Sequence, residues 1–147
     1  MKTFRSGFTL LELMIGLVVV TILASIAIPN FGKAIEKTKV KDAQTTLSAI
    51  YSAEKIYRLD QGSYGTLTQA GGDLVANNYI SNPDSSNNNA NWDFAAAGTG
   101  GGPPFNAFTA TATRTGGSYD GDAIVIDQNF DGTHYNGTGS NHPLRDQ

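Results

Sequence analysis

Apolar residues follow three successive patterns along this chain. Residues 8–28 are almost continuously apolar, and Glu12 is the single charged side chain among them. Residues 33–59 carry apolar side chains at spacings of three, four and seven, which is typical of an amphipathic helix. This stripe consists of Val40, Ala43, Leu47, Ile50 and Tyr57. Beyond residue 90, apolar and polar positions alternate in short runs, which indicates half-buried strands.

The first run is long enough to cross a membrane. A helix of residues 8–28 would be about 31 Å long at about 1.5 Å per residue, which matches the hydrocarbon core of a bilayer. Glu12 lies close to one end of this run, where a carboxylate costs less than at the bilayer centre but still requires a partner. Pro29 removes a backbone donor, and together with Gly32 it predicts a helix kink or a flexible joint after the run.

Three strands are expected in the second half of the chain, at 91–97, 105–114 and 122–128. Glycine-rich segments separate them and favour antiparallel neighbours. A short helix that begins at Asp73 is expected within the loop region 63–90. The predicted fold class is α+β. A long N-terminal helix, with a membrane-spanning half and an amphipathic half, packs on a small antiparallel sheet of three to four strands.

Composition and charge narrow the classes of function. The chain has no cysteine and a formal net charge of −3. After the N-terminal segment, basic residues cluster before residue 59, and acidic residues dominate from Asp60 onward. An acidic surface repels phosphate backbones, so we expect no nucleic acid binding by the distal domain. No nucleophile with an adjacent base is visible, so the sequence does not predict an enzyme.

The residues around the start of the apolar run carry a family resemblance. The stretch SGFTLLEL, residues 6–13, resembles the processing and assembly signal of type IV prepilins and of the pseudopilins of type II secretion. The resemblance implies that a membrane-embedded prepilin peptidase cleaves after Gly7 and methylates the new N-terminus at Phe8. It also implies that Glu12 guides subunits into a helical filament.

The same resemblance implies a division of the chain and a location. Residues 1–7 would be a leader peptide, 8–28 a transmembrane and filament-core helix, and 29–147 a periplasmic or extracellular pilin-like globular domain. The precursor would cross the bacterial inner membrane once, with the C-terminal domain exported, before it enters a pilus or pseudopilus in the periplasm or at the cell surface. Basic residues occur on both sides of the span, so this orientation depends on the resemblance and not on their count.

The function that follows is structural. The chain is expected to be a subunit of a type IV pilus-like filament, with further copies or related subunits, the prepilin peptidase and an inner-membrane assembly platform as partners. One alternative is a pseudopilin of a type II secretion system. Another is a membrane-anchored periplasmic binding module that does not polymerise. A plain secretory signal peptide is a simpler explanation of the apolar run, but the length of the run and Glu12 argue against it.

A calcium ion is the single cofactor that the sequence suggests. Asp127, Asn129 and Asp131 stand at alternate positions before a glycine, as in the first half of a calcium loop. Thr138 occupies the place of the closing glutamate. Further candidate ligands are Asp120 and Asp122. The alternative is an acidic turn, in which aspartate, asparagine and glycine are common.

Overall fold

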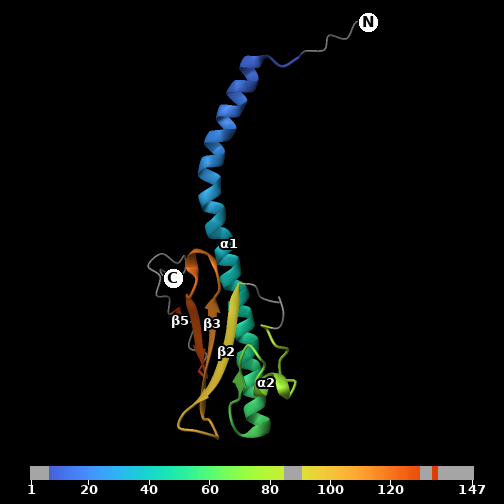
Figure 1. Ribbon diagram of the computed structural model, residues 1–147, viewed down its shortest axis with the longest axis vertical. Coiled ribbons are helices and arrows are strands. Elements are labelled where there is room, and N and C mark those ends of the chain that lie inside the picture. The colour runs from blue at the N-terminus through green and yellow to red at the C-terminus, as the bar shows by residue number, and fades with distance from the viewer. Residues whose placement is uncertain (1–6, 85–90, 130–133, 136–147) are drawn as a thin grey trace, which may run out of the picture. The chain divides into compact units, whose positions relative to one another are not determined.

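The computed structural model describes residues 7–84, 91–129 and 134–135. Its longest element is helix α1, Leu10–Gln61. The chain divides into two compact units, Met1–Glu36 and Lys37–Gln147. In the second unit, the remainder of α1 packs on an antiparallel sheet (Figure 1). This arrangement confirms the predicted α+β class, whereas the boundary predicted at residue 29 for the membrane segment stays a prediction.

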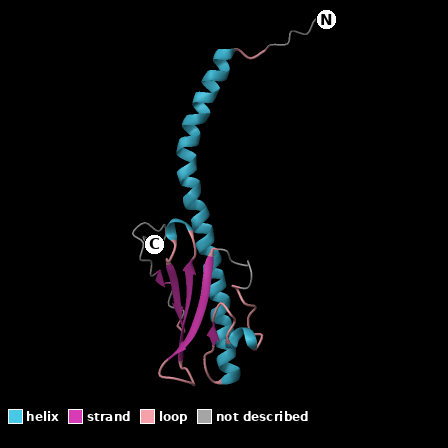
Figure 2. Cartoon of the chain, in the orientation of Figure 1, coloured by secondary structure: helices cyan, strands magenta, loops and turns pink. Residues whose placement is uncertain are grey.

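The sheet has five strands in the order β1-β2-β3-β4-β5, and each strand is antiparallel to its neighbours (Figure 2). The strands are β1 Thr66–Leu67, β2 Trp92–Thr99, β3 Ala107–Arg114, β4 Ala123–Asp127 and β5 His134–Tyr135. The three longer strands were predicted, with ends that differ by one or two residues. β1 and β5 were not, because a strand of two residues is too short to show an alternating pattern. Two short helices complete the described part, α2 Asp73–Ala76 and η1 Gly117–Tyr119.

The strand register explains why one face of the sheet is apolar. Phe94 lies opposite Ala112, which in turn lies opposite Ile124, so that the three side chains form a row across β2, β3 and β4. All three are buried, while the threonines that alternate with the alanines of β3 are partly exposed. The inward face of the sheet is therefore apolar across these three strands.

The helical side of the core follows the predicted stripe. Val40, Ala43, Leu47 and Ile50 are fully buried in the same cluster as the inward side chains of β2 to β4. The helix ends at Gln61, and Gly62 follows it with a φ of +73° and donates its N–H to the carbonyl of Arg58 at 2.8 Å. Glycine suits this position because it adopts a left-handed conformation without a steric penalty.

A truncation at Leu47 tests the packing of this core. Leu47 is 0% exposed, so Leu47→Ala should leave a cavity and lower the free energy of unfolding by about 2–5 kcal/mol. Ile56→Ala is the control on the same helix, because Ile56 is 52% exposed and should contribute less than about 1 kcal/mol. Urea unfolding of the full chain in detergent, followed by fluorescence of the single tryptophan, measures both. Equal losses for the two variants would contradict the assignment of the core.

Candidate assembly site at the start of the helix

Thr9 fixes where α1 begins. Residues 7–9 are not helical, and the backbone N–H of Glu12 donates to the side-chain oxygen of Thr9 at 3.2 Å. The N–H of Leu13 donates to the Thr9 carbonyl, also at 3.2 Å. Threonine followed three residues later by glutamate is the pattern of a capping box. A carboxylate there is further favoured by the positive end of the helix dipole. The local fold therefore places Glu12 in the first turn of the helix.

The predicted cleavage site lies directly before this cap. Gly7 and Phe8 are exposed and non-helical, and the Phe8 side chain is 78% exposed. A peptide bond in such a segment can enter a peptidase without unwinding a helix. The structure thus brings Gly7, Phe8 and Glu12 together at the N-terminal end of α1. The remaining leader residues, 1–6, lie outside the described residues.

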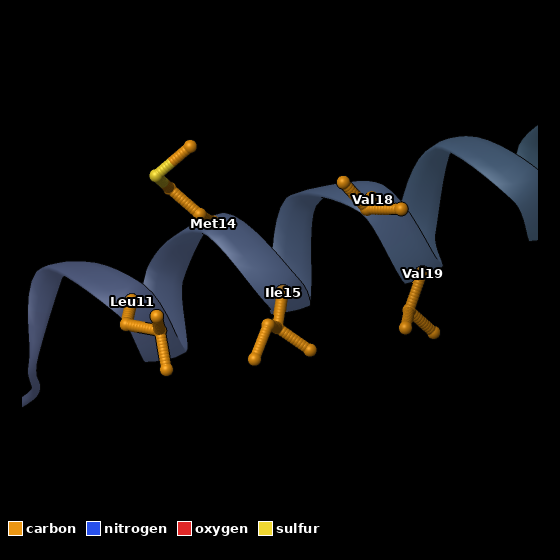
Figure 3. A pocket seen from close by; sticks show the side chains of 5 residues that line it. All are labelled: Leu11, Met14, Ile15, Val18 and Val19. Atoms are coloured by element: carbon orange, nitrogen blue, oxygen red, sulfur yellow. The ribbon is translucent and has the colours of Figure 1, made fainter.

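The helix that follows presents its apolar side chains outward. Every described side chain from Gly7 to Ile26 is exposed. Leu11, Ile15 and Val19 form one row at a spacing of four residues, and Met14 and Val18 form a second row on the other side of a shallow groove (Figure 3). Rows and grooves of this kind interlock when helices pack against one another. The first unit therefore presents an apolar helix surface of a kind that can pack against lipid or against other helices.

The hydroxyl groups of Thr21 and Ser25 within this run are satisfied by the helix itself. The Thr21 hydroxyl donates to the Leu17 carbonyl at 2.8 Å, and the Ser25 hydroxyl donates to the Ile22 carbonyl at 2.7 Å. Such bonds remove the cost of placing a hydroxyl in an apolar environment. By length and composition, α1 is long and apolar enough to cross a membrane.

The predicted joint at Pro29 and Gly32 lies inside α1. The helix continues through both residues. A side chain at Gly32 would meet no other atom within 4 Å. The glycine is therefore not required by close packing within the described residues, and the helix kink stays a prediction.

The structure describes only some of the predicted calcium ligands. Asp127 ends β4, and one of its carboxylate oxygens accepts the N–H of Asn129 at 2.9 Å. Asp120 accepts the N–H of Gly116 at 2.6 Å, and Asp122 is buried. Asp131 lies outside the described residues. Within the described part of the chain, no three histidine, cysteine, aspartate or glutamate side chains form a group that could hold a metal ion. A calcium site at Asp127, Asn129 and Asp131 stays a prediction.

Glu54 is a buried carboxylate that the sequence analysis missed. It is 0% exposed, and its Oε2 accepts the N–H of Gly65 at 2.8 Å. Its Oε1 has no hydrogen-bond partner among the described residues. Burial raises the pKa of Glu54, the Gly65 bond lowers it, and the charge of Asp73 raises it further. Position 54 continues the spacing of Leu47 and Ile50, and this spacing was the signal that could have revealed it.

The raised pKa of Glu54 predicts a pH dependence of stability. The stabilisation by the protonated carboxyl is complete below about pH 4.3, the value for an unfolded glutamate, and is lost as the pH rises through the raised pKa. Glu54→Gln retains an acceptor for Gly65 but cannot ionise. It should therefore lose less stability than the wild type between about pH 4.3 and neutral pH.

Thermal melts of the full chain in detergent across this range measure the effect. Burial also raises the pKa of Asp84, so a slope of the same sign should remain in the Gln variant. A pH profile identical to that of the wild type would contradict the buried role of Glu54.

The described structure defines a class of protein. An exposed apolar helix begins at a capped, accessible N-terminal segment, and the same helix continues into a unit where it packs on an antiparallel sheet. This is the pilin-like α+β architecture. A model of the prokaryotic N-terminal methylation motif matches residues 2–28.

Known relatives then identify the family. A type IV major pilin protein of Myxococcus xanthus is 47% identical over 58 residues, which cover 40% of this chain and 26% of the relative. A type II secretion system core protein G of Aeromonas hydrophila is 37% identical over 83 residues, 56% of this chain and 57% of the relative. The core protein G of Pseudomonas aeruginosa is 30% identical over 135 residues, 82% of this chain and 93% of the relative.

The chain belongs to the family of type IV pilins and type II secretion pseudopilins. This is a family of structural subunits. The chain spans less than two thirds of the first two relatives described, at 26% and 57% of their lengths. No solved structure gives a significant match to it.

Proposed function

We propose that the chain is a structural subunit of a type IV pilus-like filament. One observation carries this proposal: a continuous exposed apolar helix surface that begins at Glu12 in the capped first turn. In the inner membrane this surface would face lipid. In the filament it would face the helices of other copies, with the globular domains outside.

Close packing and charge pairing would drive the transfer of the helix from lipid into the filament. Lipid tails are as apolar as the helix, so association depends on close van der Waals contact and on polar partners. Glu12 supplies such a partner, because a carboxylate in an apolar bundle is costly unless it meets a cation. The N-terminal amine of Phe8 on an adjacent copy, created when prepilin peptidase removes residues 1–7, has the required charge. An inner-membrane platform would bring successive copies together.

A second candidate is a pseudopilin of a type II secretion system. The observation in its favour is the match to the Pseudomonas aeruginosa core protein G, which extends over 93% of that relative. Both candidates share the same precursor in the inner membrane and the same packing of helices, and they differ in whether the filament leaves the periplasm.

Electron microscopy of material sheared from the surface of intact cells, with an antibody to the distal domain, tests the proposal. Labelled surface filaments support the pilus subunit. Labelled filaments that appear only when the chain is overproduced support the pseudopilin. A chain that stays in the membrane as a monomer under both conditions would overturn the proposal in favour of an anchored binding module.

A further inference from the structure

The last turns of α1 expose two large apolar side chains on the face away from the core. Ile56 is 52% exposed and Leu59 is 85% exposed. At 100° per residue, these two positions lie opposite Leu47 and Glu54, which are fully buried. We call Ile56 and Leu59 the apolar ridge. Single exposed apolar residues are common on protein surfaces, so the ridge alone does not indicate an interface. The charged residues beside it supply the further argument.

Two cations, Lys55 and Arg58, form a basic flank on one side of the ridge. The Lys55 ammonium donates to the Gln128 carbonyl at 2.9 Å and to the Tyr64 hydroxyl at 3.3 Å. The Arg58 guanidinium donates to the same hydroxyl at 2.9 Å, and its Cζ lies 4.7 Å from the centre of the Tyr64 ring. Their acceptors are neutral, and neither cation contacts a carboxylate within the described part of the chain.

Two carboxylates, Asp60 and Asp73, form an acidic flank on the other side. Asp60 accepts the Tyr79 hydroxyl at 2.7 Å, and Asp73 accepts the Thr66 hydroxyl at 2.8 Å. Both residues are exposed, and their partners among the described residues are again neutral. These hydrogen bonds orient the carboxylates without neutralising them.

The two flanks face different elements. Arg58 reaches the Asn106 carbonyl just before β3, and Lys55 reaches Gln128 just after β4. Asp73 instead begins α2, and Asp60 bonds to Tyr79 shortly after α2. In Figure 1, α2 and the strands β3 to β5 lie on different sides of the last turns of α1. Opposite charges therefore stand on opposite sides of one ridge.

We infer that this end of the globular unit is a contact between copies of the chain, in which the basic flank of one copy meets the acidic flank of the next beside the apolar ridge. This inference rests on the proposed function as a filament subunit. Two different patches that complement each other make a heterologous contact, which repeats into an open helical filament and does not close into a dimer. Apolar side chains bordered by complementary charges are also the usual composition of a specific interface.

Charge reversal on each flank tests the contact. Arg58→Glu or Asp60→Lys alone would place like charges opposite each other and should reduce filament yield roughly tenfold or more. Arg58→Glu combined with Asp60→Lys in one chain restores opposite charges at each contact and should restore the yield. Asp93→Lys is the matched control, because Asp93 lies on β2, is partly exposed between the buried Trp92 and Phe94, belongs to neither flank, and should leave the yield unchanged.

Co-expression separates a contact between copies from an effect inside one copy. An Arg58→Glu chain and an Asp60→Lys chain, neither of which polymerises alone, should form mixed filaments in which the two alternate. Such rescue cannot arise from repair of a misfolded monomer. Single variants with normal yield, or a double variant that recovers while co-expression does not, would overturn the inference. If the wild type itself forms no filament, the proposed function as a filament subunit is wrong. If the wild type forms filaments and the charge reversals have no effect, only the proposed contact is wrong.

Discussion

Gly7→Glu should leave the chain as an uncut precursor of 147 residues in the membrane. The peptidase must accommodate the residue before the scissile bond, and a charged side chain replaces the one residue that has none. A side chain at Gly7 would meet no atom of the protein within 4 Å. The substitution therefore does not disturb the fold, and any loss of cleavage reflects recognition by the peptidase. Without cleavage Phe8 has no free amine, so filaments should be absent.

Mass spectrometry of the membrane fraction measures this result directly. The wild-type chain should lack residues 1–7 and carry one methyl group on Phe8, while the Gly7→Glu chain should retain all residues. Gly7→Ala is the matched control, because a single methyl group at the same position should slow cleavage without abolishing it. Complete processing of the Gly7→Glu chain would show that the cut does not follow Gly7.

Glu12→Ala should separate processing from assembly. The variant retains Gly7, Phe8 and the apolar helix, so it should be cut, methylated and held in the membrane at wild-type levels. It lacks the carboxylate that we propose pairs with the Phe8 amine of a neighbour, so that amine would be left unpaired in an apolar bundle. We expect filament yield to fall by roughly a hundredfold or more, because breaking a buried ion pair costs about 3–5 kcal/mol.

The position of Glu12 in a capping box requires a second variant. Glutamine also suits the third helical position of a capping box, so Glu12→Gln preserves the local cap while it removes the charge. If pairing with Phe8 is what matters, the Gln variant should assemble as poorly as the Ala variant. Filament counts for the two variants, normalised to processed chain in the membrane, decide between the roles. Normal filaments from Glu12→Ala would contradict the pairing.

The sequence predicted those parts of the fold that repeat a pattern over several turns or pleats. The alternation of threonine and alanine in β3 was long enough to show which residues face the core, and the spacing from Val40 to Ile50 gave the buried side of α1. Strands of two residues carry no such pattern, so β1 and β5 emerged only from their pairing with β2 and β4.

Part of the candidate site could be predicted from the sequence, and part could not. Gly7, Phe8 and Glu12 lie within six residues of one another, so the sequence alone was sufficient to predict them as one site. The cap by Thr9 was not predicted, although a threonine three residues before a glutamate is the sequence signal of a capping box. The apolar ridge and its charged flanks depend on which face of α1 the sheet covers and on bonds to Tyr64, Tyr79 and Gln128. Only the tertiary structure could reveal that surface.

Electron cryomicroscopy of the purified filament, with helical reconstruction, tests whether Glu12 pairs with Phe8 in the filament core. We expect residues 8–28 of many copies to pack around the filament axis, the chain to begin at Phe8, and each Glu12 carboxylate to lie within ion-pair distance of the Phe8 amine of a neighbouring copy. Filaments in which this helix lies outside the core, or in which Glu12 faces solvent without a partner, would contradict this expectation.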